Sequence, residues 1–345
     1  MNKDLLALAT RNVTDIINLA IEHRSSSGPS PESADSKALV VYDTRYGLTD
    51  ILTAAYRAAL PDARFIDFDT TNKEDVIAAF DAMQPGDLVV LIQSSNFLLD
   101  AFRIRLHLFN KKLKVIEHLH LHRNTEDIWG VYVNALEYDI DWYRGVGPKL
   151  KAKLEHIKEL RIQAGGAELV VTGGVLSPKL NIGDYAGMEN IGGTFPIGEV
   201  FTECADFTQM NGSFMIYAYA GSDFSINMHT PFRVDVKEGL IVGWQDDAPE
   251  SFGKIIENIK EFERPLVREI GFGLNRAITR ERYMQDITAF ERLVGLHFSL
   301  GEKHSVYKKE GITAHKAKFH IDVFPVVDRV LADGAVIFEN GKYLV

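Results

Sequence analysis

The sequence contains a single cysteine, Cys204, among its 345 residues. One thiol cannot form an intramolecular disulfide, and it cannot supply the several thiolates of a sulfur-ligated metal site. Scarce cysteine suits a reducing compartment, so we expect a cytoplasmic protein. The sequence also lacks an apolar run long enough to cross a bilayer and an apolar segment after a basic start. It therefore predicts neither a membrane span nor a standard secretion signal.

Positive charge is also in short supply. Lysine and arginine together number 38 against 48 aspartate and glutamate residues, which gives a formal net charge of −10. Proteins that bind nucleic-acid backbones carry clustered basic side chains, so this composition argues against a nucleic-acid partner. We expect a peptide or small-molecule substrate instead. The apolar fraction of 46% is ordinary for a globular protein, and the length is sufficient for two domains.

The first half of the chain alternates short apolar runs with helical patterns. A helix is expected over residues 3–24, and a flexible segment rich in serine and proline follows near 25–36. Apolar runs then occur at 38–42, 63–68, 87–92 and 113–119, with helical patterns near 48–60, 73–83 and 97–109. This alternation predicts an α/β domain with a mostly parallel sheet. The turn after the first run has no GxGxxG motif, so a dinucleotide-binding fingerprint is absent.

The pattern changes near residue 164. The preceding region ends in the charged run Lys151–Arg161, which we interpret as a helix that bridges two domains. Short strands and glycine turns follow, with helices expected only near 249–262 and 280–290. Asn340-Gly341 is typical of a hairpin turn. The sequence therefore predicts an α/β domain at 1–163 and a β-rich α+β domain at 164–345.

The second domain carries carboxylates and imidazoles inside short apolar segments. The five candidates are Glu199, Glu269, His297, His320 and Asp322. Residues i and i+2 of a strand face the same way, so the last two can reach one ion. Glycines beside the glutamates, such as Gly198 and Gly271, permit close approach of a ligand. Nitrogen and oxygen donors of this kind suit zinc, manganese or cobalt, so we predict a metal-binding domain.

These segments resemble those of a known enzyme family. GEVFT around Glu199, REIGFGLN around Glu269, HFSLG from His297 and FHID around His320 and Asp322 follow the order seen in the aminopeptidase T and aminopeptidase S family of dinuclear metallo-aminopeptidases. The resemblance covers roughly residues 160–345. It implies that the five side chains bind two divalent ions, that a bridging water attacks the peptide carbonyl, and that the protein is a homodimer.

The chain differs from that family beside His297. Family members carry an Asp-Glu-Asn run before this histidine and a tyrosine seven residues after it. Here the first region reads Phe290-Glu291-Arg292-Leu293, and the later position is His304, with Tyr307 three residues further on. His304 and Tyr307 could orient or protonate a substrate or stabilise an oxyanion, or they could belong to a solvent loop.

Further charged side chains have minor candidate roles near the predicted ligands. Glu203 and Glu291 are candidates for a base or an additional ligand. Arg268 and Arg276 flank Glu269 and could neutralise its charge or bind a carboxylate.

Two alternatives to an aminopeptidase stay open. The same segments resemble, more distantly, the iron-dependent dihydroxypyridine dioxygenases, which have a histidine where Glu269 stands. In that interpretation His297, His320 and Asp322 hold a single Fe(II). The other alternative is a non-catalytic relative that keeps the fold, with a metal ion as a structural element.

A second group of histidines lies in the first domain. His118, His120 and His122 alternate in the sequence EHLHLH and would share one face of a strand. Over four residues a strand extends about 13 Å, so the three cannot meet at one ion. We therefore interpret them as surface, loop or subunit-contact residues.

Overall fold

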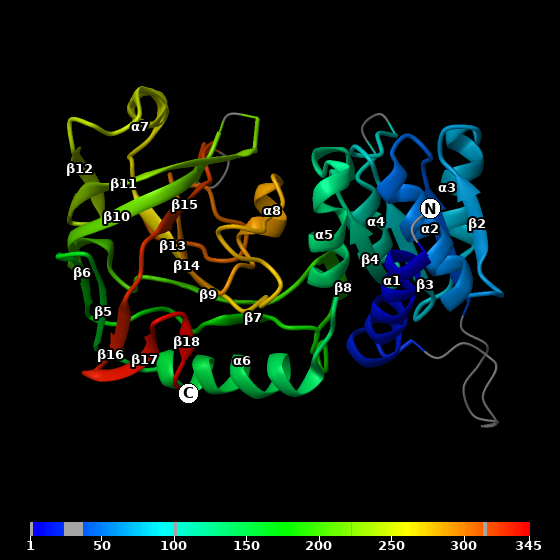
Figure 1. Ribbon diagram of the computed structural model, residues 1–345, viewed down its shortest axis with the longest axis horizontal. Helices are drawn as coiled ribbons and strands as arrows, with labels where there is room; N and C mark the ends of the chain where they lie inside the picture. The colour runs from blue at the N-terminus through cyan, green and yellow to red at the C-terminus, as the bar shows by residue number, and fades with distance from the viewer. Residues whose placement is uncertain (1–2, 24–36, 100–101, 222, 313–315) are drawn as a thin grey trace. The chain divides into compact units, whose positions relative to one another are not determined.

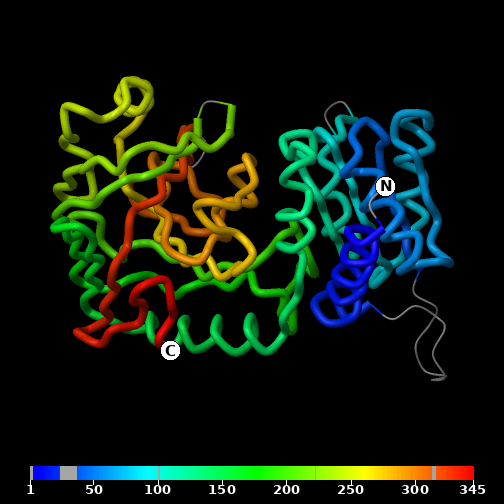
Figure 2. Tube along the Cα trace, in the orientation of Figure 1, coloured from blue at the N-terminus to red at the C-terminus, as the bar shows by residue number. Residues whose placement is uncertain are grey.

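The computed structural model describes residues 3–23, 37–99, 102–221, 223–312 and 316–345. The expected flexible segment at 25–36 lies outside these residues. The chain divides into two compact units. The first, here called the α/β unit, comprises Met1–Arg144, Gly183–Ile197 and Ala277–Ala289; the second, the β-rich unit, comprises Gly145–Ile182, Gly198–Arg276 and Phe290–Val345. The colours of Figure 2 show that each unit is built from separate stretches of the chain.

This division differs from the expected boundary between residues 163 and 164, which falls inside the strand β5 (Glu159–Ala164). The chain leaves the α/β unit at Arg144 and returns to it twice. On its first return it supplies β8 (Ile191–Phe195), which pairs in parallel with β4 (Lys114–His118). A linear pattern of apolar residues cannot reveal such a return, because nothing local marks the partner of a strand.

The α/β unit contains a five-stranded parallel sheet, as the alternating pattern predicted (Figure 1). Its order is β2-β1-β3-β4-β8, with β1 at Ala38–Tyr42, β2 at Arg64–Asp67 and β3 at Leu88–Ile92. The residues of β3 are all buried and apolar, as expected for a central strand covered on both faces. Each such side chain contributes about 1.5–3 kcal/mol by burial.

The helices of this unit follow the predicted pattern except in one region. The helices are α1 (Lys3–Asp15), the π-helix η1 (Ile16–Ala20), α2 (Gly47–Ala59), α3 (Lys73–Ala82), α4 (Ile104–Asn110), the 3-10 helices η2 (Leu121–Arg123) and η3 (Glu126–Ile128), and α5 (Trp129–Ala135). The expected helix at 97–109 begins only at Ile104. The preceding segment buries Phe97 and Leu99, and Leu99 forms an isolated bridge with Phe102.

The three alternating histidines do not share a strand face. β4 ends at His118, and His120 adopts a left-handed conformation with φ of 51° before η2. His118 is fully buried between two phenols: its Nε2 lies 2.8 Å from the hydroxyl of Tyr56 and its Nδ1 lies 2.9 Å from that of Tyr132. The expectation of a surface, loop or contact role is therefore wrong for His118, which is a core residue.

The β-rich unit is organised around one large antiparallel sheet (Figure 1). Its strand order is β18-β17-β16-β5-β6-β10-β15-β14-β13-β9-β7, and β11 and β12 extend from β10. The remaining strands are β6 (Ala167–Thr172), β7 (Lys179–Asn181), β9 (Glu199–Glu203), β10 (Met210–Ala220), β11 (Ile226–Lys237), β12 (Leu240–Trp244), β13 (Val267–Gly273), β14 (Gly295–Leu300), β15 (Ile321–Pro325), β16 (Arg329–Ala332), β17 (Ala335–Glu339) and β18 (Lys342–Tyr343).

Hairpin turns in this unit match the sequence expectation. Asn340 and Gly341 join β17 to β18, and both have the positive φ that this turn requires. Glu238 and Gly239 join β11 to β12 with the same feature. The sequence thus identified strand ends correctly wherever the turn residues were distinctive.

After α5 the helices are few. They are α6 (Ile140–Leu154), α7 (Glu250–Phe262), the short α8 (Ile287–Phe290) and the 3-10 helix η4 (Phe207–Gln209). The expected helix at Lys151–Arg161 is wrong beyond Leu154. From Glu159 onward, alternate residues of β5 are buried, and this period of two belongs to a strand. The helix expected near 280–290 is reduced to α8.

Among the described residues, no helix is both long and apolar enough to span a membrane.

Candidate metal centre

Four neighbouring strands of the large sheet carry the predicted ligands. In the order β9-β13-β14-β15 they bear Glu199, Glu269, His297 and Asp322. The pairing sets Glu269 opposite Glu203, Gly271 opposite His297, and Ser299 opposite Asp322. Because side chains alternate along each strand, this register directs all four ligands to the same face of the sheet.

Gly271 makes the room that His297 needs. A Cβ atom built at Gly271 would lie 2.1 Å from Cε1 of the His297 ring, so any other residue at this position would force the ring to move. The imidazole therefore lies over the bare backbone of β13. The sequence expectation that a glycine beside Glu269 permits close approach is confirmed, although the side chain that approaches is His297.

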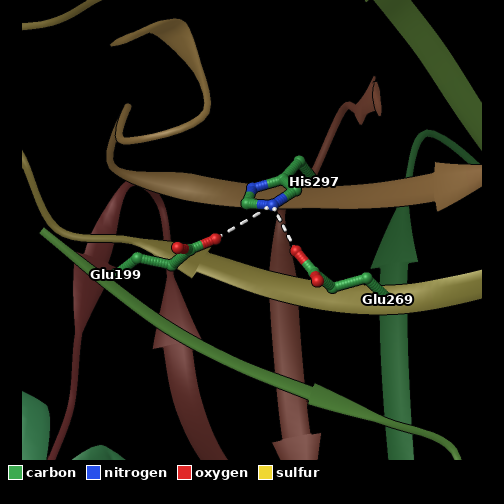
Figure 3. Close-up of side chains that lie close together, drawn as sticks. All are labelled: Glu199, Glu269 and His297. Atoms are coloured by element: carbon green, nitrogen blue, oxygen red, sulfur yellow. Dashed lines mark hydrogen bonds and ion pairs between the residues drawn. The ribbon is translucent and has the colours of Figure 1, made fainter. Parts of the chain in front are cut away.

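Three of the predicted ligands converge in the buried interior, as Figure 3 shows. The Nε2 atom of His297 lies 3.2 Å from Oε1 of Glu199 and 3.3 Å from Oε1 of Glu269 (Figure 3). All three residues are at least nine-tenths buried. Two donors about 2.1 Å from one ion at a tetrahedral angle lie about 3.4 Å apart, so these separations suit a shared divalent ion.

A second group of donors includes the same histidine. Glu291, His297 and Asp322 offer ligand atoms that all lie within 4.8 Å of one another. Asp322 is buried, and its Oδ1 forms an ion pair with Nε2 of His320 at 3.2 Å, without the alignment of a hydrogen bond among the described residues. A buried carboxylate oxygen needs a cation or a donor beside it, which either protonated His320 or a metal ion supplies here. Asp322 therefore fits the prediction of a metal ligand.

His320 is the most exposed of the five predicted ligands. Its side chain is 30% exposed, and its Nε2 lies 3.2 Å from Oδ1 of Asp322. The Nδ1 atom lies 3.0 Å from the carbonyl oxygen of Lys303, so Nδ1 carries the proton in the neutral ring. The lone pair is then on Nε2, beside Asp322. A backbone carbonyl that orients a histidine in this way is typical of metal sites.

His304 has the opposite arrangement. Its Nδ1 accepts hydrogen bonds from the backbone N–H groups of Val306 and Tyr307 at 3.1 and 3.2 Å. Nε2 therefore carries the proton and donates a hydrogen bond to Oε2 of Glu269. His304 thus holds Oε2 of Glu269 while His297 faces Oε1, and its geometry is that of a positioning residue.

Tyr307 contacts the backbone. Its hydroxyl donates to the carbonyl oxygens of Ser177 and Phe201 at 2.8 and 3.1 Å. Its own carbonyl accepts a hydrogen bond from Arg268, whose Nε donates to Glu203 at 2.7 Å. Arg268 therefore pairs with Glu203 and leaves Glu269 to the histidines, while Arg276 is exposed. These contacts give Tyr307 and Arg268 roles in holding the loop against the sheet.

Arg292 is the residue that the sequence did not single out. Its guanidinium forms an ion pair with Glu199 through Nη1, and its Nη2 lies 2.7 Å from Oε1 of Glu291. The side chain is 10% exposed. The sequence signal was present in the segment Phe290–Leu293, which differs from the family pattern, but the partner of the arginine could not be read from it.

The charges in the cluster shift its pKa values strongly. Burial raises the pKa of Glu291 to about 8, assisted by the charges of Glu199 and Asp322. Burial opposes charge on His320, but the nearby Asp322 carboxylate raises its pKa to about 10. In the same way Glu199 and Glu269 raise the pKa of His297 well above its ordinary value.

Glu269 shows the reciprocal effect. Burial disfavours its charge, yet hydrogen bonds from His297 and His304 lower its pKa well below the ordinary range. The carboxylates therefore attract positive charge, and a bound divalent ion would compete with the protons on the imidazoles. The nitrogen and oxygen donors, their spacing and the buried Asp322 carboxylate together show that these residues could hold a metal ion.

Comparison with known proteins gives a likeness in fold. No protein-family model matches the sequence, and no curated protein is significantly similar to it. Among solved structures, the chain is similar to 2,5-dihydroxypyridine dioxygenase from Pseudomonas putida KT2440. The TM-score is 0.64, the sequence identity is 15%, and the alignment covers 98% of this chain and 97% of the other. At this identity the likeness concerns the fold.

Proposed function

We propose that the protein is a metal-dependent hydrolase that removes N-terminal residues from peptides. The observation that supports this most is the convergence of Glu199, Glu269 and His297 at separations suited to one divalent ion. The segments that carry these residues also resemble those of the metallo-aminopeptidases. An acidic, buried centre of this kind suits a substrate that presents a free amino group.

The residues of the cluster would have different roles in such a reaction. Glu199, Glu269 and His297 would hold the ion, with Asp322 and His320 beside them. A bound zinc, manganese or cobalt ion would lower the pKa of a water ligand and polarise the substrate carbonyl. His304 keeps Glu269 in place through its Nε2 hydrogen bond. Glu291, with its pKa raised to about 8, could take up and release a proton near neutral pH.

The test is hydrolysis of aminoacyl-p-nitroanilides by protein loaded with each divalent metal. Glu269→Gln should reduce kcat/KM at least about 100-fold and should lower metal content, because one carboxylate ligand is lost. Glu250→Gln is the matched control, since Glu250 lies on α7 in the same unit and pairs with exposed Lys254. Unchanged hydrolysis and metal content in folded Glu269→Gln would refute the proposal.

A second candidate is a single-iron dioxygenase that opens an aromatic ring. The fold likeness to a dihydroxypyridine dioxygenase over nearly the whole chain favours it, as does the pairing of His320 with Asp322. In this proposal His297, His320 and Asp322 would hold one Fe(II). Oxygen uptake with Fe(II) and a dihydroxypyridine, absent in Asp322→Asn, would support it. Peptide hydrolysis without oxygen uptake would favour the hydrolase.

A further inference from the structure

Arg292 brings a fixed positive charge into the cluster. Its two terminal nitrogens contact Glu199 and Glu291, one from each of the two donor groups that could hold an ion. In each group, one carboxylate oxygen therefore forms an ion pair with the guanidinium. The side chain is nearly buried, so water screens its charge weakly.

The two donor groups differ in which carboxylate oxygens face His297 and which contact the guanidinium. Glu199 pairs with Arg292 through Oε2 and keeps Oε1 directed at His297 (Figure 3). Glu269 also directs Oε1 at the same nitrogen. In the other group the guanidinium contacts Oε1 of Glu291, and that group shares His297 with the first. A second ion, added in the second group to one in the first, would lie beside the guanidinium and would lack His297, which the first ion holds.

We propose that Arg292 takes the place of a second metal ion, so that the centre binds one ion per chain, at Glu199, Glu269 and His297. This inference rests on the proposed metal centre and adds its stoichiometry. The arginine compensates the surplus carboxylates of the second group, which a second divalent ion would otherwise neutralise. Replacing it with an uncharged side chain frees the oxygens of Glu199 and Glu291 that it contacts, and with the nearby Asp322 these can hold a second ion.

The experiment counts manganese ions on the full-length protein. Equilibrium dialysis against Mn²⁺ with elemental analysis gives the stoichiometry, and electron paramagnetic resonance distinguishes an isolated ion from a spin-coupled pair. The unaltered protein should bind about one ion with an isolated-ion spectrum. Arg292→Gln should bind about two with a coupled spectrum, whereas Arg292→Lys, which keeps the charge, should bind about one.

Arg161→Gln is the matched control. Arg161 lies in the same unit and also bridges two glutamates, Glu159 and Glu168, but on β5. Its removal should leave the count at one. Arg292→Met is a second uncharged replacement in case Arg292→Gln does not fold, and circular dichroism with a thermal melt checks each variant.

Two ions in the unaltered protein would overturn the inference and leave the metal centre standing. One ion in folded Arg292→Gln or Arg292→Met would also overturn it. No Mn²⁺ bound by any variant would refute the metal centre itself, and the inference with it. The number of bound Mn²⁺ ions therefore distinguishes a wrong stoichiometry from the absence of a metal centre.

Discussion

His118 and His297 are both buried histidines in or at the end of a strand, but their surroundings have opposite effects. His118 lies between the hydroxyls of Tyr56 and Tyr132, and burial lowers its pKa to about 3. His297 meets the carboxylates of Glu199 and Glu269, which raise its pKa despite equal burial. Burial alone thus does not determine the charge of a histidine; the groups that face its nitrogens do.

The difference has a consequence for stability. His118 is neutral and satisfied by two hydroxyls, whereas metal-free His297 is the counter-charge of two buried carboxylates. Removing one partner of a buried ion pair leaves an uncompensated charge. The two histidines therefore respond differently to substitution, to pH and to crowding by a neighbour.

The largest expected effect is on the charged histidine. His297→Ala should lower the free energy of unfolding of the metal-free protein by about 3–5 kcal/mol, because Glu199 and Glu269 lose their shared counter-charge. Urea denaturation of the two proteins measures the difference. His118→Gln, which keeps an amide between the two tyrosines, should cost about 1–3 kcal/mol. Equal losses in the two variants would contradict the comparison.

A smaller effect is expected from crowding the ring of His297. Gly271→Ala should cost about 1–3 kcal/mol and weaken metal binding about tenfold, because the new methyl group would occupy the position of the imidazole. Thermal unfolding and a metal titration measure the two effects. Gly243→Ala is the control, since a Cβ there lies 3.9 Å from its nearest neighbour, the flexible side chain of Asp235. Unchanged metal affinity in Gly271→Ala would show that His297 does not bind the ion.

Taken per pH unit, the smallest effect is a pH dependence of opposite sign at the two sites. An unfolded histidine takes up a proton near pH 6.5, whereas folded His118 does so only near pH 3. Between these values the unfolded state binds more protons, so the free energy of unfolding falls as the pH falls, by up to about 1.4 kcal/mol per pH unit. Metal-free His297 has a raised folded pKa, so its contribution is lost as the pH rises.

Urea titrations between pH 3 and pH 7 on His118→Gln test this sign. The slope of stability against pH should become shallower than in the unaltered protein. His23, whose pKa burial lowers to about 4, keeps a residual slope of the same sign. A slope unaffected by His118→Gln would mean that His118 is protonated in the folded state.

The sequence was informative where structure is local. The apolar run Leu88–Ile92 identified a central strand, and Asn340-Gly341 identified a hairpin, because burial on both faces and a positive φ each leave a mark on composition. Lys151–Arg161 was misread as one helix because its charges suit both a helix surface and an exposed strand face. The division into units was unreadable because β8 returns to a sheet begun far earlier in the chain.

The candidate site shows the same limit. Glu199, Glu269 and His297 were predicted together and lie together, since each segment resembled a known ligand segment. The contact of Arg292 with Glu199, the tautomer of His304 and the space above Gly271 depend on which strands are neighbours. Such neighbours are fixed by long-range packing, which a single sequence does not display.

The place of β15 in the sheet sets an order of assembly during synthesis. β15 lies between β10 and β14, so it joins two strands that both leave the ribosome earlier (Figure 1). It also carries Asp322, while Glu199, Glu269 and His297 belong to strands that are already translated. In a nascent chain the ligand set therefore stays incomplete until β15 pairs with β10 and β14. An ion bound by Asp322 and by the ligands of the earlier strands would hold β15 in place, so that metal uptake and the insertion of β15 become one event.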